Sequence, residues 1–229
     1  MIFDALELFP KVETTAQQVG GCLRRLVLSC GGEKFDGAWR EVSELRPARR
    51  SEIGWMLQEH YLKCWPGVVM LQLTITAGGI PCGCIVYAMP PRETMKRYGG
   101  MTWELARLWV HDSVPRNVET WIIGKSIRWI KRNHPEVVCL VSYADPAFGH
   151  GGTIYKASNW KADGRTDGER KSPRIDYKDA VTGQTYSRRS HVPATATIER
   201  VPRSSKWRFV MPLHRQNEKL CDPLGETPR

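Results

Sequence analysis

The stretch from Val137 to Trp160 constrains the fold more than any other part of the sequence. An apolar run ends in the polar sequence SYADP (142–146), a glycine-rich bend, GHGG (149–152), follows, and TIYKAS (153–158) has the composition of a short helix. This order predicts a buried strand whose carboxyl end enters a loop that feeds a helix. Because ligands bind at the carboxyl ends of strands in open α/β sheets, the loop is a candidate site.

The sequence before this stretch predicts a hairpin-rich sheet. Residues 17–30 have the pattern of a strand or a short helix. Residues 51–65 follow helical spacing, with Ser51 as a candidate N-cap. The apolar runs 68–76 and 80–89 flank Ala77-Gly78-Gly79, a hairpin signal. Residues 102–110 form another expected strand.

The strongest helix signal covers residues 118–133. Asn117 can cap it, isoleucines recur along one face, and His134-Pro135 ends it. With the strand at 137–143, the order becomes β-β-β-α-β-α. We therefore predict an α/β (α+β) fold with a central mixed, mainly antiparallel sheet flanked by helices, and a right-handed crossover within it.

Three regions are expected along the chain. Residues 1–160 form the core and residues 161–213 a basic extension that ends in a strand at 206–213 of the same domain. Residues 214–229 form a tail. The stretch 161–208 carries 12 Lys or Arg against 6 Asp or Glu and few large apolar residues. A long basic segment of this kind in a compact domain is usually functional or disordered.

Charge points to a polyanionic partner. The 34 Lys and Arg exceed the 24 Asp and Glu by 10 over 229 residues, which favours nucleic acid, an anionic membrane surface or a phosphorylated cofactor. No apolar run approaches the ~18 residues of a membrane span. The N-terminal MIFDALELFP lacks the basic start of a secretory signal, so we expect the cytoplasm. The cysteines lack the C-x-x-C spacing of zinc ribbons.

Arg107 is the first candidate site residue. An Arg inside an apolar strand is costly to bury unless it meets an anion or a ligand. It could clamp an anion or a carbonyl group, or it could lie at the surface of an edge strand. Glu104 is a possible partner, although strand alternation directs residues 104 and 107 to opposite faces.

Asp145 is the second candidate. It stands at a strand end before Pro146 and beside glycines that leave room for a ligand. It could be a general base, a metal ligand or the residue that orients a base. The alternative is an Asx-turn or a helix cap.

Three further residues are ambiguous from sequence. Tyr155 could be catalytic or pack in the core, and Tyr143 could lie in the core or in a cleft. His60 shares a helical stripe with apolar residues, so it could be a hydrogen-bonded core histidine. Its position becomes functional only if the stripe faces the Asp145 loop.

A phosphate site is predicted at PRNVET (115–120). Free backbone N–H groups and the positive end of the helix dipole gather there, beside Arg116. The interleaved cations and aromatics of the extension, such as Arg208 and Trp207, suit phosphates and an unstacked base. A solvated basic loop is the alternative.

The element order, with a cleft where a strand end meets a helix start, resembles the GNAT acyltransferase fold. PRNVET stands in place of the glycine-containing loop of that superfamily. Within it, ELARLWVHDSVPRN (104–117), SYADP, GTIYKASNW (152–160) and KWRFVMPL (206–213) closely resemble the phage Mom DNA-modification family.

This resemblance implies a transferase that converts adenine in double-stranded DNA to N6-carbamoylmethyladenine and so protects phage DNA from host restriction. It implies the catalytic residues Arg107, Asp145, Tyr155, His60 and Tyr61. It also implies that Thr120 lies at the donor-phosphate site, which the helix start already predicts at Arg116 and Asn117. The donor is acetyl-CoA or another activated compound. The resemblance also implies iron, for which His60, Tyr61, Asp145 and Tyr155 offer N and O ligands.

Two other functions remain open at this stage. One is a GNAT-type acyltransferase for tRNA, protein or a small molecule, although the basic extension disfavours a neutral metabolite. The other is a basic DNA-binding protein without enzymatic activity, which leaves Arg107 and the Asp145 loop without a role.

Overall fold

The structure, a computed structural model, describes residues 15–19, 22–27, 40–41, 43–99, 101–112, 114–167, 171–172, 174–183, 185–186 and 192–214. The predicted tail, residues 214–229, lies outside these residues except for its first residue. The sequence predicts a strand or a short helix over residues 17–30. Those of them that the structure describes, 17–19 and 22–27, belong to two antiparallel strands, β1 (Thr15–Val19) and β2 (Cys22–Val27).

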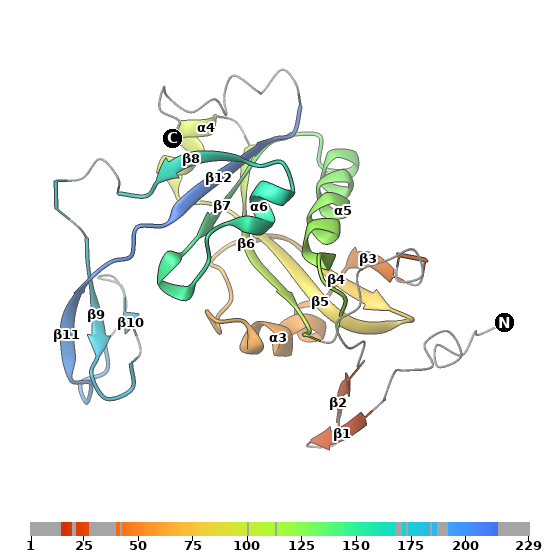
Figure 1. Cartoon of the computed structure of the whole chain (residues 1–229), viewed down its shortest axis with the longest axis horizontal. Helices are drawn as coiled ribbons and strands as arrows, with labels where there is room; N and C mark the ends of the chain where they lie inside the picture. The colour runs from red at the N-terminus through yellow and green to blue at the C-terminus, as the bar shows by residue number, and fades with distance from the viewer. Residues whose placement is uncertain are drawn as a thin grey trace.

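The centre of the fold is a mixed sheet of seven described strands in the order β3-β4-β5-β6-β7-β12-β8 (Figure 1). Only β6 and β7 pair in parallel, so the predicted mainly antiparallel sheet is confirmed. The strands are β3 (Ser43–Pro47), β4 (Val69–Ala77), β5 (Ile80–Ala88), β6 (Met101–Val110), β7 (Val137–Ala144), β12 (Trp207–Pro212) and β8 (Lys161–Arg165).

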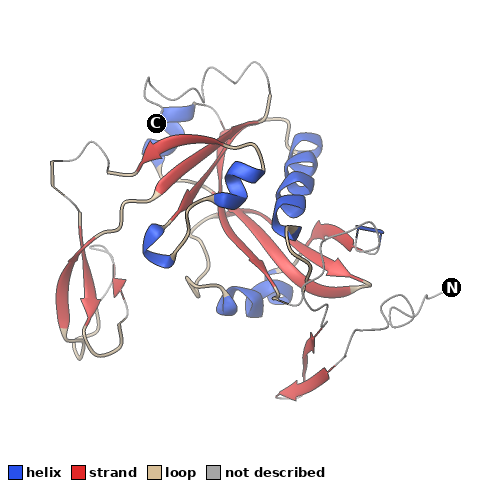
Figure 2. Cartoon of the chain, in the orientation of Figure 1, coloured by secondary structure: helices blue, strands red, loops and turns tan. Residues whose placement is uncertain are grey.

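Helices cover both faces of this sheet (Figure 2). On one face lie α5 (Val118–Asn133) and the short α6 (Thr153–Ala157); on the other lie α3 (Arg50–Glu59) and α4 (Arg92–Tyr98). Strand alternation divides the side chains of β5 between the two cores: Ile85 and Tyr87 pack with α5, Cys84 and Val86 with α3.

The α5 face carries the larger core. Val118, Ile122, Ile123 and Ile130 are almost fully buried at helical spacing. Each such side chain contributes about 1.5–3 kcal/mol by leaving water. This face therefore fixes the position of α5 and of the turn that precedes it.

Several predicted boundaries are wrong. The helix expected over 51–65 starts at Arg50 after the cap residue Arg49, so Ser51 is not its N-cap, and it ends at Glu59. Asn117 does occupy the cap position of α5, but it has a left-handed backbone and no capping side-chain bond. The helix predicted over 118–133 is confirmed.

A three-stranded arm projects from the sheet (Figure 1). It consists of β9 (Ile175–Asp179), β10 (Thr185–Tyr186) and β11 (Ile198–Pro202), with β9 in the middle. The chain then returns as β12, which pairs with β7 and β8 inside the main sheet. No helix among the described residues is long and apolar enough to span a membrane.

Candidate active site

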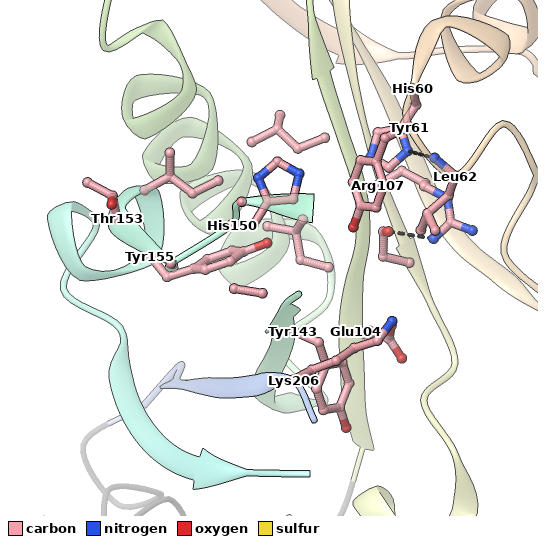
Figure 3. A pocket seen from close by; sticks show the side chains of 18 residues that line it. His60, Tyr61, Leu62, Glu104, Arg107, Tyr143, His150, Thr153, Tyr155 and Lys206 are labelled. Atoms are coloured by element: carbon pink, nitrogen blue, oxygen red, sulfur yellow. Dashed lines mark hydrogen bonds between the residues drawn. The ribbon is translucent and has the colours of Figure 1, made fainter. Parts of the chain in front are cut away.

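A cavity opens where the two parallel strands separate. Their pairing stops at Leu105 opposite Ser142, although β6 continues to Val110. Beyond that point β7 remains paired with β12. The resulting cavity of about 460 Å³, which we call the splay cavity, is lined by β6, the end of β7, the loop 149–152, α6, residues 60–62 and Lys206 (Figure 3). Its volume is typical of small-molecule sites.

A bulge in β6 brings Glu104 and Arg107 to the same face. Val86 pairs with Arg107 and Tyr87 with Leu105, so Ala106 is an extra residue in the strand. The bulge reverses the alternation that follows it. The expectation that residues 104 and 107 face opposite sides is therefore wrong, and both line the splay cavity.

Arg107 is 9% exposed, which excludes the surface position that the sequence left open. Its Nε donates to the Cys64 carbonyl at 3.0 Å, and its Nη1 donates to the Ala106 carbonyl at 2.6 Å. Its Nη2 lies 3.3 Å from the Cys64 sulfur. The guanidinium thus ties the segment after α3 to the sheet and brings a permanent charge to the cavity.

Glu104 is the residue whose role the sequence did not indicate. Burial raises the pKa of its carboxyl to about 7, against the opposing effects of Arg107 and Lys206. Near neutral pH it can therefore both accept and release a proton. Figure 3 shows Glu104, Tyr143 and Lys206 at one end of the cavity, and His60, Tyr61 and Arg107 at another.

Tyr155 reaches the cavity from α6. Its hydroxyl lies 2.7 Å from that of Ser142, which lies 2.8 Å from the Leu105 carbonyl oxygen. When Ser142 donates its single proton to this carbonyl, it accepts one from Tyr155. Burial raises the pKa of Tyr155 to about 12, so the phenol is protonated at neutral pH. Its ring also packs on Phe209, so Tyr155 is both a core residue and a cavity residue.

Asp145 lies beside the cavity and is not among the residues that line it. Its Oδ1 accepts from the Ser204 hydroxyl at 2.6 Å and from the Ala147 N–H at 3.1 Å, and its Oδ2 lies 3.3 Å from Lys206 Nζ. Burial favours the neutral acid, but these three partners outweigh it and hold the pKa of Asp145 below its ordinary value. The carboxylate thus caps the turn Pro146–Phe148 and anchors Lys206.

Four aromatic rings gather at the rim. Tyr61 lies 4.4 Å from the ring of His60 and 4.8 Å from the rings of Phe148 and His150. Phe148 is 53% exposed and Tyr61 is 38% exposed. Aromatic surface left open beside a cavity is available to another planar ring.

A backbone hydrogen bond determines which ring nitrogen of His60 carries the proton. Its Nδ1 accepts from the Leu62 N–H at 3.1 Å. Burial, with the positive charge of Arg107, lowers its pKa to about 4. The ring is therefore neutral near pH 7, and its proton lies on Nε2.

As arranged here, the four residues expected to hold iron do not present a ligand set. Nδ1 of His60 is occupied and Nε2 carries a proton, which leaves no lone pair for a metal. The ammonium group of Lys206 lies against Asp145 and would repel a cation. The described residues also contain no group of three or more His, Cys, Asp or Glu that could hold a metal.

The predicted donor-phosphate residues lie at the start of α5. Arg116 and Asn117 are exposed, and the Thr120 hydroxyl donates to the Asn117 carbonyl at 2.8 Å. None of the three lines the splay cavity. Their role in donor binding stays a prediction.

The splayed strand pair, the cavity between its strands and the helices on both faces define an α+β protein with the mixed, mainly antiparallel sheet that the sequence predicted. The chain belongs to the Mom protein family, whose model matches residues 48–227. It is 40% identical over 108 residues to the methylcarbamoylase mom of Escherichia phage Mu. That match covers 44% of this chain and 45% of the phage Mu protein, somewhat less than half of each.

Solved acetyltransferase structures are also similar to the chain. The spermidine N-acetyltransferase from Vibrio cholerae, in complex with CoA and spermine, gives a TM-score of 0.45 at 6% identity, covering 76% of this chain and 96% of that one. The ribosomal-protein-S18-alanine N-acetyltransferase from Escherichia coli gives a TM-score of 0.45 at 9% identity. The match covers 75% of this chain and 94% of that one. The family assignment rests on the family match and not on these scores.

Proposed function

We propose that this protein is a transferase that modifies N6 of adenine in phage DNA, in the cytoplasm of the host, to N6-carbamoylmethyladenine. The modification would protect the phage DNA from restriction. One observation carries the proposal. In a chain of the Mom family, the splay cavity gathers a carboxyl that titrates near neutrality, a buried guanidinium and a protonated phenol, from Glu104, Arg107 and Tyr155.

Each of these groups suits a step of transfer to an amine. When a donor carbon bonds to N6, the nitrogen must lose one proton, and the Glu104 carboxylate can accept it. The carrier that leaves the donor takes up the bonding electrons, and Tyr155 can supply it with a proton. Arg107 stabilises negative charge that develops in the cavity.

The target adenine must leave the duplex to reach this cavity. Extrusion costs a few kcal/mol, which stacking on aromatic side chains offsets. Tyr61, Phe148 and His150 offer open ring surface at the rim. Tyr143 is a weaker candidate for the stack, because its hydroxyl is bonded to Thr94 at 3.0 Å and its ring packs against the α4 core.

The donor is acetyl-CoA or another activated compound, with Arg116, Asn117 and Thr120 as the proposed phosphate site. Simple acyl transfer would leave an acetyl group on N6. The carbamoylmethyl product instead requires the methylene carbon of the donor to end on the nitrogen. This requirement favours a donor that is activated at that carbon.

Mass spectrometry of nucleosides from DNA of bacteria that express the protein tests the proposal. We expect a carbamoylmethyl-shifted adenine nucleoside with the wild type. We expect its loss with Glu104→Gln, which keeps the shape of the side chain but cannot accept the proton. Glu44→Gln, at an exposed carboxyl of the edge strand β3, is the matched control and should retain the product.

Ordinary DNA nucleosides from folded wild-type protein would contradict the proposal. RNA digested in parallel provides the second arm of the experiment. A modified nucleoside found only in RNA would make tRNA the substrate of the same reaction, an alternative that the basic charge of the chain leaves open.

A further inference from the structure

A second cavity lies beside the splay cavity and is unlike it in composition. It measures about 690 Å³, and we call it the basic cavity. It lies among α4, the end of β7, residues 166, 167 and 174, and the chain that leads into β12. Its lining contains six cationic side chains: Lys96, Arg97, Arg174, Arg203, Lys206 and Arg208.

Carboxylates hold these cations in place. Asp163, which is 3% exposed, accepts from Arg97 at 3.2 Å and from Arg208 at 2.8 Å, and it also accepts from the Tyr98 hydroxyl. Asp176 accepts twice from Nε of Arg203, at 3.0 and 2.9 Å. A guanidinium held from one side is pre-organised to bind a second anion through its remaining N–H groups.

Ion pairing within the protein does not account for all of this charge. One buried carboxylate, Asp163, serves two guanidinium groups, and each of the other four cations has one carboxylate partner. Six cations therefore face five carboxylates, and one positive charge is left over beside an open cavity. A network that served stability alone would gain little from paired charges that remain partly exposed. The excess positive charge favours an anionic ligand.

Two neighbours of the basic cavity indicate what the ligand is. Tyr143 and Lys206 line both cavities, so the basic cavity adjoins the proposed base-binding site. At its other side stands the base of the arm, where the Arg203 N–H donates to the Arg174 carbonyl at 2.7 Å. A ligand that follows this path runs from the aromatic rim past Lys206 to the arm, as an extended polymer would.

We propose that the basic cavity binds backbone phosphates of the nucleic-acid strand whose base enters the splay cavity, with Lys206 at the junction. The inference rests on the proposed function in taking nucleic acid as the partner. The phosphates of the donor are the other source of the same chemistry. Their proposed site is at the start of α5, which packs on the face of the sheet opposite α4.

Fluorescence anisotropy with a short labelled DNA duplex, at several potassium chloride concentrations, tests the inference. In Lys96→Gln/Arg97→Gln, two phosphate contacts are lost. The slope of log Kobs against log salt concentration should become shallower by about 1.8, at about 0.9 per contact. Lys131→Gln/Arg132→Gln, two exposed cations in the last turn of α5, is the charge-matched control and should keep the wild-type slope.

A second variant guards against loss of folding. Lys96→Glu reverses a charge whose side chain is 59% exposed and whose ion-pair partner, Glu93, is itself exposed. It should weaken DNA binding while thermal unfolding stays as in the wild type. The same variants are titrated with CoA, and its affinity should not change.

An unchanged salt slope in both cavity variants would overturn the inference, and so would loss of CoA affinity with DNA binding intact. These outcomes are separate from failure of the proposed function. If the proposed function fails, DNA from cells that express the wild-type protein contains no modified nucleoside, while the binding assay still reports on the basic cavity.

Discussion

Glu104 and Arg107 of the splay cavity lie inside the sheet, whereas the cations of the basic cavity lie on α4, at the base of the arm and on the chain around β12. Arg107 is bonded to backbone carbonyls and Glu104 has a raised pKa, because little water reaches either group. Arg97 and Lys206 are each about one-third exposed and paired with carboxylates. Burial therefore shifts the protonation of charged groups in the splay cavity. In the basic cavity the partly exposed charges stay ionised and can bind a ligand.

The largest expected effect comes from the wall of the splay cavity. Gly152 has φ of +78°, and a Cβ added there would lie 2.2 Å from the Phe209 ring. Gly152→Ala should lower the free energy of unfolding by about 3 kcal/mol or more, from backbone strain and overpacking together. Urea denaturation measures this loss.

Gly149→Ala is the matched control in the same loop. Gly149 has φ of +75°, and nothing lies within 4 Å of an added Cβ. The free energy of unfolding of this variant should fall only by the cost of backbone strain, about 1 kcal/mol. Equal losses at the two glycines would show that the contact with Phe209 is not what fixes α6.

Arginine-to-lysine exchange compares the two cavities directly. Arg107→Lys keeps the charge but loses the planar fork that bonds to Cys64 and Ala106. We expect a loss of about 2 kcal/mol of stability and at least a tenfold loss of nucleoside modification. Arg97→Lys should cost less than about 1 kcal/mol. Similar losses at both positions would remove the distinction between the cavities.

Much of this arrangement could be predicted from the sequence, because it depends on local pattern. The α5 helix, the β4–β5 hairpin and the strand, loop and helix around Asp145 all follow from periodicity and from Gly and Pro signals. Arg107 is recognisable as a charged residue inside an apolar strand, and Tyr155 by its place in the short helix after the glycines. The splay cavity brings both of them together.

The rest depends on contacts that sequence spacing does not record. The bulge at Ala106, which turns Glu104 toward Arg107, is set by the register with β5. The position of Lys206 depends on β12 inserting between β7 and β8. The buried Asp163 showed no sequence signal, so the basic cavity was visible only as a surplus of Lys and Arg.

Glu104 should make stability and activity respond to pH in opposite directions. Its pKa rises from 4.5 in the unfolded chain to about 7 in the fold. The native state therefore binds the proton more tightly, and stability present below pH 4.5 is lost as the pH rises through 7. The loss is roughly 3 kcal/mol, while modification of DNA should increase over the same range as the carboxylate forms.

Glu104→Gln separates these two effects. The amide cannot ionise, so the variant should be inactive and yet lose less stability between pH 5 and pH 8 than the wild type. Denaturation at both pH values and nucleoside analysis measure this. Glu44→Gln, at an exposed carboxyl that lines neither cavity, should leave both curves unchanged. A wild-type pH dependence in Glu104→Gln would assign the titration to another group.

The smallest expected effect links the two cavities through Lys206. Lys206→Met removes an ammonium group that lowers the pKa of both Glu104 and Asp145. The pH–activity curve should therefore move to higher pH, and the salt slope of DNA binding should become shallower by about 0.9. Stability should change by less than about 1 kcal/mol, because the side chain is partly exposed.

Lys96→Met is the control for this pair of readouts, because Lys96 lines the basic cavity alone. It should change the salt slope and leave the pH–activity curve in place. If Lys206→Met also changed only the slope, its charge would not reach Glu104, and the two cavities would be adjacent but independent. If Lys206→Met alone shifts both the pH–activity curve and the salt slope, then the Lys206 side chain acts both on the proton acceptor Glu104 and on the bound DNA strand.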